Sequence, residues 1–320
     1  MAEGNQEDPT WFHAAKVLAR KQGIRSSLIN ATTSRSTADG VDLCDHAGQL
    51  LLHCSWQQLS NTGAPPEVQS AQRRVAAADA AACGFLPISV VIALLLQAMP
   101  ITRFLLRGLM IWFHEFGHAV VAWFSGRQAL PLPLGWMVYN PDRSVVVMLL
   151  LLSLEGVLLV MGVRSKHRMF TSFAATLIAF QLLGWFWLPH ATFQVLMSWS
   201  GIAGEFILPT VLIVLSLYPL PDYFKWSFYR YPVQLASCYG LVRSLMFWRD
   251  VSSGRVGVPY GSIWNPDHGD MNDLVHIGWS ESDIIRSYDS LGWCCVLCIG
   301  AVACYRLLQW RRALELKQRG

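Results

Sequence analysis

Long apolar runs alternate with short polar stretches from about residue 84 to the end of the chain. Four of these runs hold about 20 or more mostly apolar residues, the length that a helix needs to cross a bilayer. A fifth is as long but contains ionisable side chains, and a sixth is shorter and ends before a proline. The four long runs cover residues 144–163, 169–188, 193–220 and 288–308. The fifth covers residues 101–125, and the sixth covers residues 84–99. The pattern predicts an all-α fold, a polytopic transmembrane helix bundle of about five or six hydrophobic segments.

Residues 1–80 differ from the rest because they are polar and carry charges of both signs. We expect them to form a polar, partly disordered N-terminal extension, and residues 81–320 to form the membrane-embedded domain. Within that domain, residues 221–286 are mostly too polar to cross a bilayer. Their first part mixes aromatic and basic side chains, as helices at a membrane surface do. The basic residues of the loops disagree about orientation, so the sequence predicts no topology.

The composition favours a membrane protein and excludes other classes. Hydrophobic residues make up 53% of the 320 residues and charged residues only 14%, whereas soluble domains contain about 25% charged residues. A net charge of +4 is too small for a protein that binds nucleic acid. We therefore expect an integral, multi-pass membrane protein that lies in a lipid bilayer and has no nucleic-acid partner. The sequence does not identify the membrane or the oligomeric state.

The sequence His114-Glu115-Phe116-Gly117-His118 carries the clearest chemistry. Helical residues four apart project from one face, so two imidazoles at this spacing can bind one zinc ion. Glu115, next to the first ligand, can take a proton from a water molecule that the metal activates. Each ionisable side chain inside a membrane helix costs about 2.5–3.5 kcal/mol. A metal site explains three of them in five residues better than the alternative, a polar cluster that only joins helices.

The residues around this motif resemble a known family. Phe113-His114-Glu115-Phe116-Gly117-His118-Ala119, followed by Ala122 and Gly126, is similar to the signature of the site-2 protease family of intramembrane zinc metalloproteases. The resemblance implies a membrane-embedded peptidase whose zinc is bound by both histidines, with Glu115 as the catalytic residue. It also implies a third zinc ligand, an aspartate in a later segment, often within Asn-Pro-Asp-Gly.

Asp267 is the preferred third ligand because Asn265-Pro266-Asp267 matches the start of that sequence. His268 replaces the expected glycine, which leaves the register open, so Asp270, His268 and Glu205 are alternatives. The residues around 267–270 could instead form a solvated turn, with Asp270 as the N-cap of a helix that begins near Met271.

Three of the other ionisable side chains within the hydrophobic segments are candidates for a role at the site. Glu155 and Glu205 are functional candidates by their position, although either could be protonated and hydrogen-bonded inside the bundle. Arg107 lies seven residues before His114 and therefore on nearly the same helix face. It could neutralise a carboxylate near the site, or it could extend to the membrane surface.

The function predicted from the sequence is that of a zinc-dependent metalloendopeptidase, a hydrolase that acts in the membrane. It would cleave peptide bonds in or near transmembrane segments of membrane-protein substrates. The alternative from another class is a non-catalytic membrane metal-binding protein: a chaperone, a transporter or a degenerate relative of the proteases. A peptidase that acts on substrates at the membrane surface is a further possibility.

Overall fold

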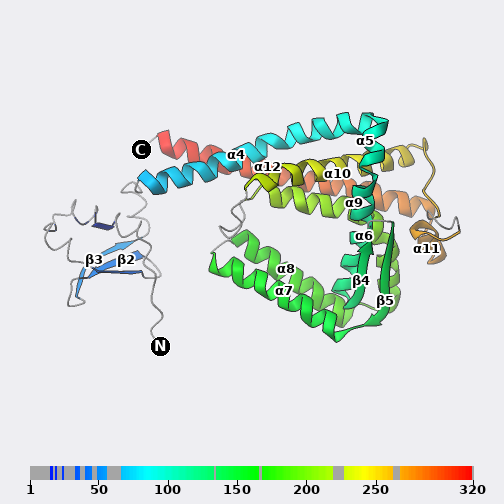
Figure 1. Ribbon diagram of the computed structural model, residues 1–320, viewed down its shortest axis with the longest axis horizontal. Coiled ribbons are helices and arrows are strands. Elements are labelled where there is room, and N and C mark those ends of the chain that lie inside the picture. Colours follow the sequence, from blue (N-terminus) through cyan, green and yellow to red (C-terminus); the bar gives the residue numbers. More distant parts are fainter. Residues whose placement is uncertain are drawn as a thin grey trace. The chain divides into compact units, whose positions relative to one another are not determined.

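The computed structural model describes residues 15–16, 19, 24, 33–36, 40–44, 49–55, 66–132, 135–165, 168–218, 227–261 and 267–318. The chain divides into two compact units, Met1–Ala77 and Ala78–Gly320. Figure 1 labels most of the elements of each unit.

The first unit contains a small antiparallel sheet that the sequence pattern did not predict. Its strands are β1 (Thr33–Ser36), β2 (Gly40–Cys44) and β3 (Leu50–Ser55), in the order β1-β2-β3. Val41 and Leu43 alternate along β2 and are buried, and Cys54 of β3 pairs with Val41. Alternate side chains of a strand point to one face, and these pack with Ala15 and Ala19 in one apolar cluster.

The second unit is a bundle of helices, as the sequence predicts. Among the described helices, five are long and apolar enough to cross a membrane. The chain is an integral, multi-pass membrane protein. The helices are α4 (Pro66–Ala98), α5 (Pro100–Leu105), α6 (Arg107–Phe124), α7 (Val145–Arg164), α8 (Arg168–Trp187), α9 (His190–Ser216), α10 (Arg230–Ser252), α11 (Asp270–His276) and α12 (Glu281–Gln318), with a 3₁₀ turn, η1 (Ser227–Tyr229).

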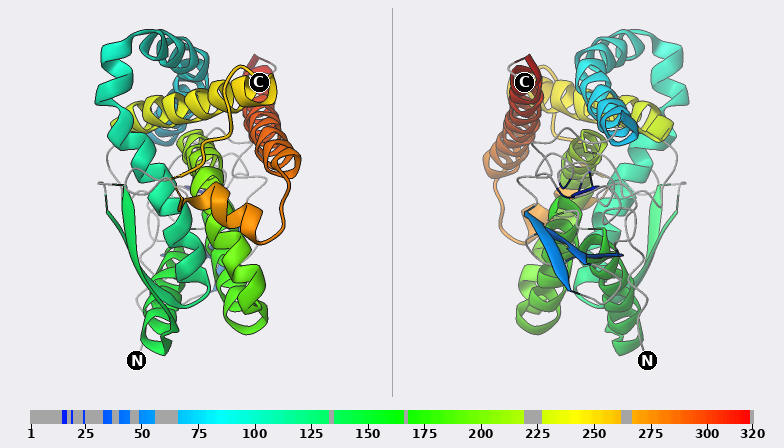
Figure 2. Two further views of the ribbon diagram at one scale, coloured as in Figure 1. Left: turned by 90° about the vertical axis from the view of Figure 1, so that its right-hand side faces the viewer. Right: turned by 90° about the vertical axis from the view of Figure 1, so that its left-hand side faces the viewer.

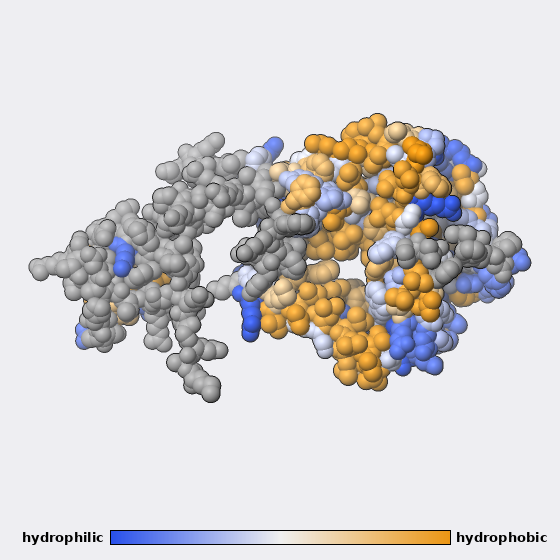
Figure 3. All heavy atoms as spheres, in the orientation of Figure 1, coloured by the Kyte–Doolittle hydropathy of each residue, from blue (hydrophilic) through white to orange (hydrophobic). Residues whose placement is uncertain are grey.

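Apolar side chains cover much of the outer surface of this unit. Leu95 on α4 and Leu150 on α7 are more than 60% exposed, at 62% and 66%. The hydropathy surface is orange over α4 and over α7 and α8 (Figure 3). An apolar patch of this extent would be unfavourable in water, so it is the surface expected to face lipid.

Helix α9 is the centre of the bundle. Of its span 56% is buried, against 11% for α7 and 17% for α8. It packs against α6, α10, α11 and α12, and Figure 2 shows α11 lying across it. Helix α10 was not predicted as a helix, yet it buries Tyr239 and Trp248 in the core shared with α9 and α12. The polar sequence of α10 does not predict a helix, and contacts with the rest of the bundle stabilise it.

The predicted segment 101–125 is two helices, α5 and α6, which meet at Leu106. Proline at the first position suits the start of α5. Helix α6 is followed by a hairpin of β4 (Arg127–Leu132) and β5 (Trp136–Arg143), which was not predicted either. The hairpin runs beside α6 (Figure 1), where Trp123 donates a hydrogen bond to the carbonyl oxygen of Ala129 at 2.9 Å.

Candidate metal centre

Glycines allow α6 and α9 to pack with their backbones almost in contact. A Cβ atom added to Gly117 would lie 2.1 Å from the carbonyl oxygen of Ser200 and 2.9 Å from the Cα of Gly204. One added to Gly204 would lie 2.6 Å from the Cα of Gly117. Any larger residue would therefore separate the helices. This contact brings the histidine face of α6 against the middle of α9.

Three side chains converge at this contact. His114 and His118 of α6 and Asp270 of α11 each offer one ligand atom, and these atoms lie within 4.8 Å of one another. Asp270 Oδ2 is 3.0 Å from His114 Nε2 and 3.2 Å from His118 Nε2, and the two Nε2 atoms are 3.2 Å apart. Ligands about 2.0–2.1 Å from a tetrahedral ion stand about 3.3 Å apart. The group therefore could bind a metal ion.

Gly201 provides the space beside these atoms. A Cβ atom at this position would lie 2.5 Å from His118 Nε2, 2.6 Å from Asp270 Oδ2 and 2.6 Å from His114 Cε1. Asp270 Oδ2 is buried and has no hydrogen-bond partner among the described residues. A buried carboxylate oxygen without a donor is unfavourable unless another ligand, such as a cation, occupies the space in front of it.

Hydrogen bonds on the far side of each imidazole fix its orientation. His118 Nδ1 donates to the carbonyl oxygen of Met197 at 2.7 Å. His114 Nδ1 donates to Glu205 Oε1 at 3.2 Å, and Ser244 donates to Glu205 Oε2 at 2.8 Å. With a proton on Nδ1, each Nε2 keeps its lone pair for a metal. Glu205 is therefore a partner of His114 and is not in the ligand group.

Asp270 is the first residue of α11, whose position is set by a neighbouring loop. Gly261 N–H donates to Asn272 Oδ1 at 2.7 Å, and a Cβ on Gly269 would lie 2.4 Å from the Gly261 carbonyl oxygen. Met271, next to Asp270, is buried in the bundle core. Burial raises the pKa of Asp270, but the positive charges of His118 and His114 in their protonated forms outweigh burial, so the pKa of Asp270 lies below its ordinary value.

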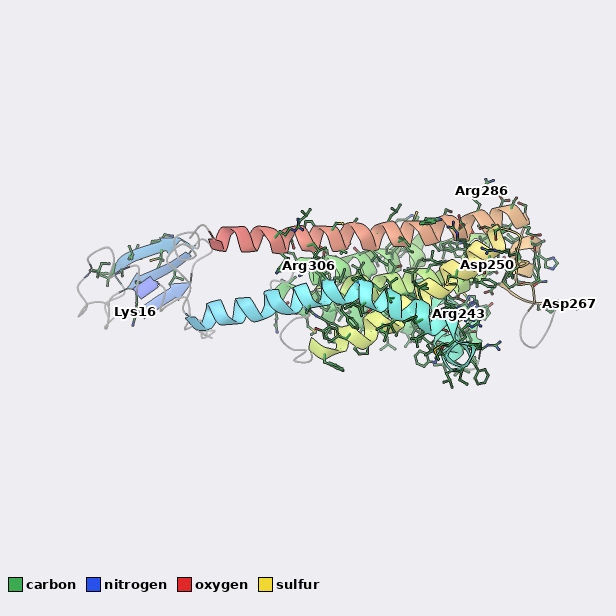
Figure 4. All side chains as sticks on the ribbon, turned by 90° about the horizontal axis from the view of Figure 1, so that it is seen from above. Lys16, Arg243, Asp250, Asp267, Arg286 and Arg306 are labelled. Carbon is green, nitrogen blue, oxygen red and sulfur yellow. The ribbon has the colours of Figure 1, made fainter. Side chains whose placement is uncertain are left out.

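The structure therefore favours Asp270 over Asp267 beside the histidines. Asp267 and His268 are exposed and are not in the ligand group, and Figure 4 shows Asp267 at the edge of the molecule. The preference for Asp267 relied on the match at residues 265–267, of which 265 and 266 lie outside the described residues. Because α11 begins at Asp270, its N-cap is Gly269, and the alternative of Asp270 as N-cap is not what the structure shows.

The candidate metal centre lies where two cavities meet. One has a volume of about 500 Å³ and is bordered by β5 and the start of α9, and the other has a volume of about 870 Å³ and is bordered by α5, α6 and α10. Glu115, His118 and Asp270 line both cavities. The Glu115 side chain is thus accessible from the same space as two of the ligand groups.

Comparison with known proteins fits this geometry. Residues 87–134 match the family model described as Peptidase M50B-like. The likeness is confined to this stretch of the chain, which contains α6 with both histidines and Glu115. No curated protein and no solved structure matches the chain.

The rest of the centre lies outside the stretch that matches the family model. Gly201 and Glu205 are on α9 and Asp270 is on α11, all beyond residue 134. The sequence indicated Glu205 and Asp270 as candidates, but Gly201 was not among them. The Gly201-x-x-Gly204 spacing beside an intramembrane acid was the signal for a close helix contact. Glu155, the other acid considered, is buried on α7 and lines neither cavity.

Proposed function

We propose that this protein is a membrane-embedded zinc metalloprotease that hydrolyses peptide bonds in or near transmembrane segments of other proteins. The observation that carries the proposal is the convergence of His114, His118 and Asp270 in space that Gly201 leaves open, with Glu115 lining the same cavities. Two imidazoles, a carboxylate and an open position are typical of catalytic zinc sites.

Each protein group has a defined part in this reaction. His114, His118 and Asp270 would hold the ion, and zinc, when bound, supplies Lewis-acid activation of water and of the substrate carbonyl. Glu115 accepts the proton from the attacking water and passes it to the departing amine as the C–N bond breaks. Glu205 and the Met197 carbonyl keep the imidazoles oriented while this happens.

The cavities support a peptide as the substrate. A chain that is cut at the centre must extend away from it in both directions, and two cavities with largely different linings reach the centre. Since the carbonyls of a transmembrane helix are already hydrogen-bonded within the helix, the substrate must unwind locally before it is cut. Cleavage sites in membrane-protein substrates should therefore be rich in residues with low helix propensity.

The test compares purified full-length protein with its Glu115→Gln variant in liposomes that contain zinc and a panel of single-span test proteins. The variant should retain zinc and the wild-type unfolding temperature but lose at least about 10²–10⁴-fold in cleavage rate. Mass spectrometry of the products identifies the bond. Equal cleavage by the two proteins would contradict the proposal. Zinc binding without cleavage by the wild-type protein would favour a non-catalytic metal-binding protein.

A further inference from the structure

Three arginines from three helices line the larger cavity. Arg103 is on α5, Arg107 is the first residue of α6, and Arg243 is on α10. The same cavity reaches His114 and Asp270. Figure 4 labels Arg243 on α10. The candidate metal centre thus shares its larger cavity with a group of positive charges.

The side chains of these arginines form no ion pair and no side-chain hydrogen bond within the described part of the chain. The cavity also contains acids, namely Glu115, Glu205, Asp250 and Asp270. Asp250, on the same cavity, pairs with Arg255 at 2.7 Å. Glu205 accepts hydrogen bonds from His114 and Ser244. Arg103 and Arg107 are exposed and Arg243 is half-buried, so their guanidinium groups can donate hydrogen bonds to an anion that enters the cavity.

The other lining groups indicate what kind of molecule carries that anion. The Oε1 atom of Gln97 is buried without a hydrogen-bond partner among the described residues and needs a donor. Met110, Ile202 and Phe247 give the cavity apolar walls. A peptide with an acidic side chain offers all three features: a backbone N–H for Gln97, apolar side chains and a carboxylate. The same cavity reaches Glu115 and the proposed ligands, which is where the substrate of a peptidase must lie, so a peptide fits it better than a phospholipid headgroup.

Helix geometry gives the distance between the arginines and the reacting bond. Arg107 precedes His114 by seven residues, so it lies on nearly the same face and about 10 Å along the helix axis. An extended peptide advances about 3.3 Å per residue. We infer that the larger cavity binds the substrate through an acidic residue about three positions from the cleaved bond, paired with Arg107 and Arg243. This inference rests on the proposed function for the identity of the substrate.

Binding is measured first, because it does not require cleavage. The probes are labelled apolar decapeptides with one aspartate or, as the control, one asparagine at the same position. They are titrated against Glu115→Gln protein in phosphatidylcholine nanodiscs with zinc. The aspartate peptide should bind about tenfold more tightly, as charge-assisted hydrogen bonds do. When Arg243→Gln is introduced into the same protein, the ratio of its affinities for the aspartate and asparagine peptides should fall close to one. Arg243→Lys should keep part of the preference for the aspartate peptide.

Arg286 supplies the matched control. It is exposed at the outer edge of α12 (Figure 4) and does not line the cavity, so Arg286→Gln should leave the ratio unchanged. Equal binding of the two peptides, or an unchanged ratio in Arg243→Gln protein, would overturn the inference. It would also be overturned if Arg243→Gln weakened binding of phosphatidylglycerol in mixed nanodiscs and left the peptide ratio unchanged, since the cavity would then bind a lipid headgroup.

Cleavage separates this inference from the proposed function. Wild-type protein receives peptides in which the aspartate is moved one position at a time, and the cut bond is mapped. The rate should be highest with the acid about three positions from the cut. If Glu115-dependent cleavage occurs at the same rate for aspartate and asparagine peptides, the proposed function stands and the anion site fails. If aspartate-selective binding occurs without any cleavage, the anion site stands and the proposed function fails.

Discussion

Gly201→Ala should remove the metal while leaving the fold intact. The new methyl group would lie 2.5 Å from His118 Nε2 and 2.6 Å from Asp270 Oδ2, where ordinary contacts begin at 3.4 Å. Each ligand atom must therefore retreat by about 0.8–0.9 Å, whereas metal sites tolerate deviations of about 0.2 Å. Loss of an outer hydrogen-bond partner alone costs about 10–100-fold in metal affinity. Displacement of the ligands themselves should cost at least about 100-fold.

The fold should tolerate this change because the methyl group meets the ends of side chains. Alanine in place of a helical glycine also stabilises by about 0.5–1 kcal/mol. The matched control is Gly156→Ala on α7, where a Cβ has no atom within 4 Å. Gly117→Ala differs from both because its Cβ would meet the Ser200 backbone, and it should lower the unfolding temperature.

The assay combines zinc titration with metal analysis of purified proteins and with thermal unfolding in detergent. The Gly201→Ala protein should lose zinc, and the Gly156→Ala protein should keep zinc. The unfolding temperature of the metal-free Gly201→Ala protein should be equal to or higher than that of the metal-free wild-type protein. If Gly201→Ala bound zinc as tightly as Gly156→Ala, the metal would not lie in the space beside Gly201, and the proposed centre would be wrong.

Three further predictions concern the ligand groups. Asp270→Ala should abolish zinc binding and Asp267→Ala should leave it nearly unchanged, as measured by metal analysis; equal losses would contradict Asp270 as the third ligand. Glu205→Gln should weaken zinc affinity by about 10–100-fold, because His114 loses a charged acceptor; an unchanged affinity would show that this hydrogen bond does not orient the imidazole. Removal of metal with a chelator should stop cleavage, and added zinc should restore it; activity that survives complete removal would exclude a metalloprotease.

Much of the fold and half of the site follow from local sequence. The apolar runs predicted the membrane helices because spanning a bilayer imposes a length and a composition that a single segment must satisfy alone. The His114 and His118 pair was recognisable because both residues lie on one turn of one helix, where spacing determines geometry. Helix α10 and the β4–β5 hairpin were missed because packing against the bundle, and not their own hydropathy, stabilises them.

What the sequence by itself determined is therefore the membrane bundle, the histidine pair and the nearby Glu115. Only the tertiary structure places Asp270, and not Asp267 three residues earlier, beside the two histidines. The physical reason is that the proposed third ligand comes from a different helix. Its register depends on where α11 begins, on the contact between Gly261 and Gly269, and on the space left by Gly201 of α9. Such contacts join residues far apart in the chain, and no local pattern encodes them.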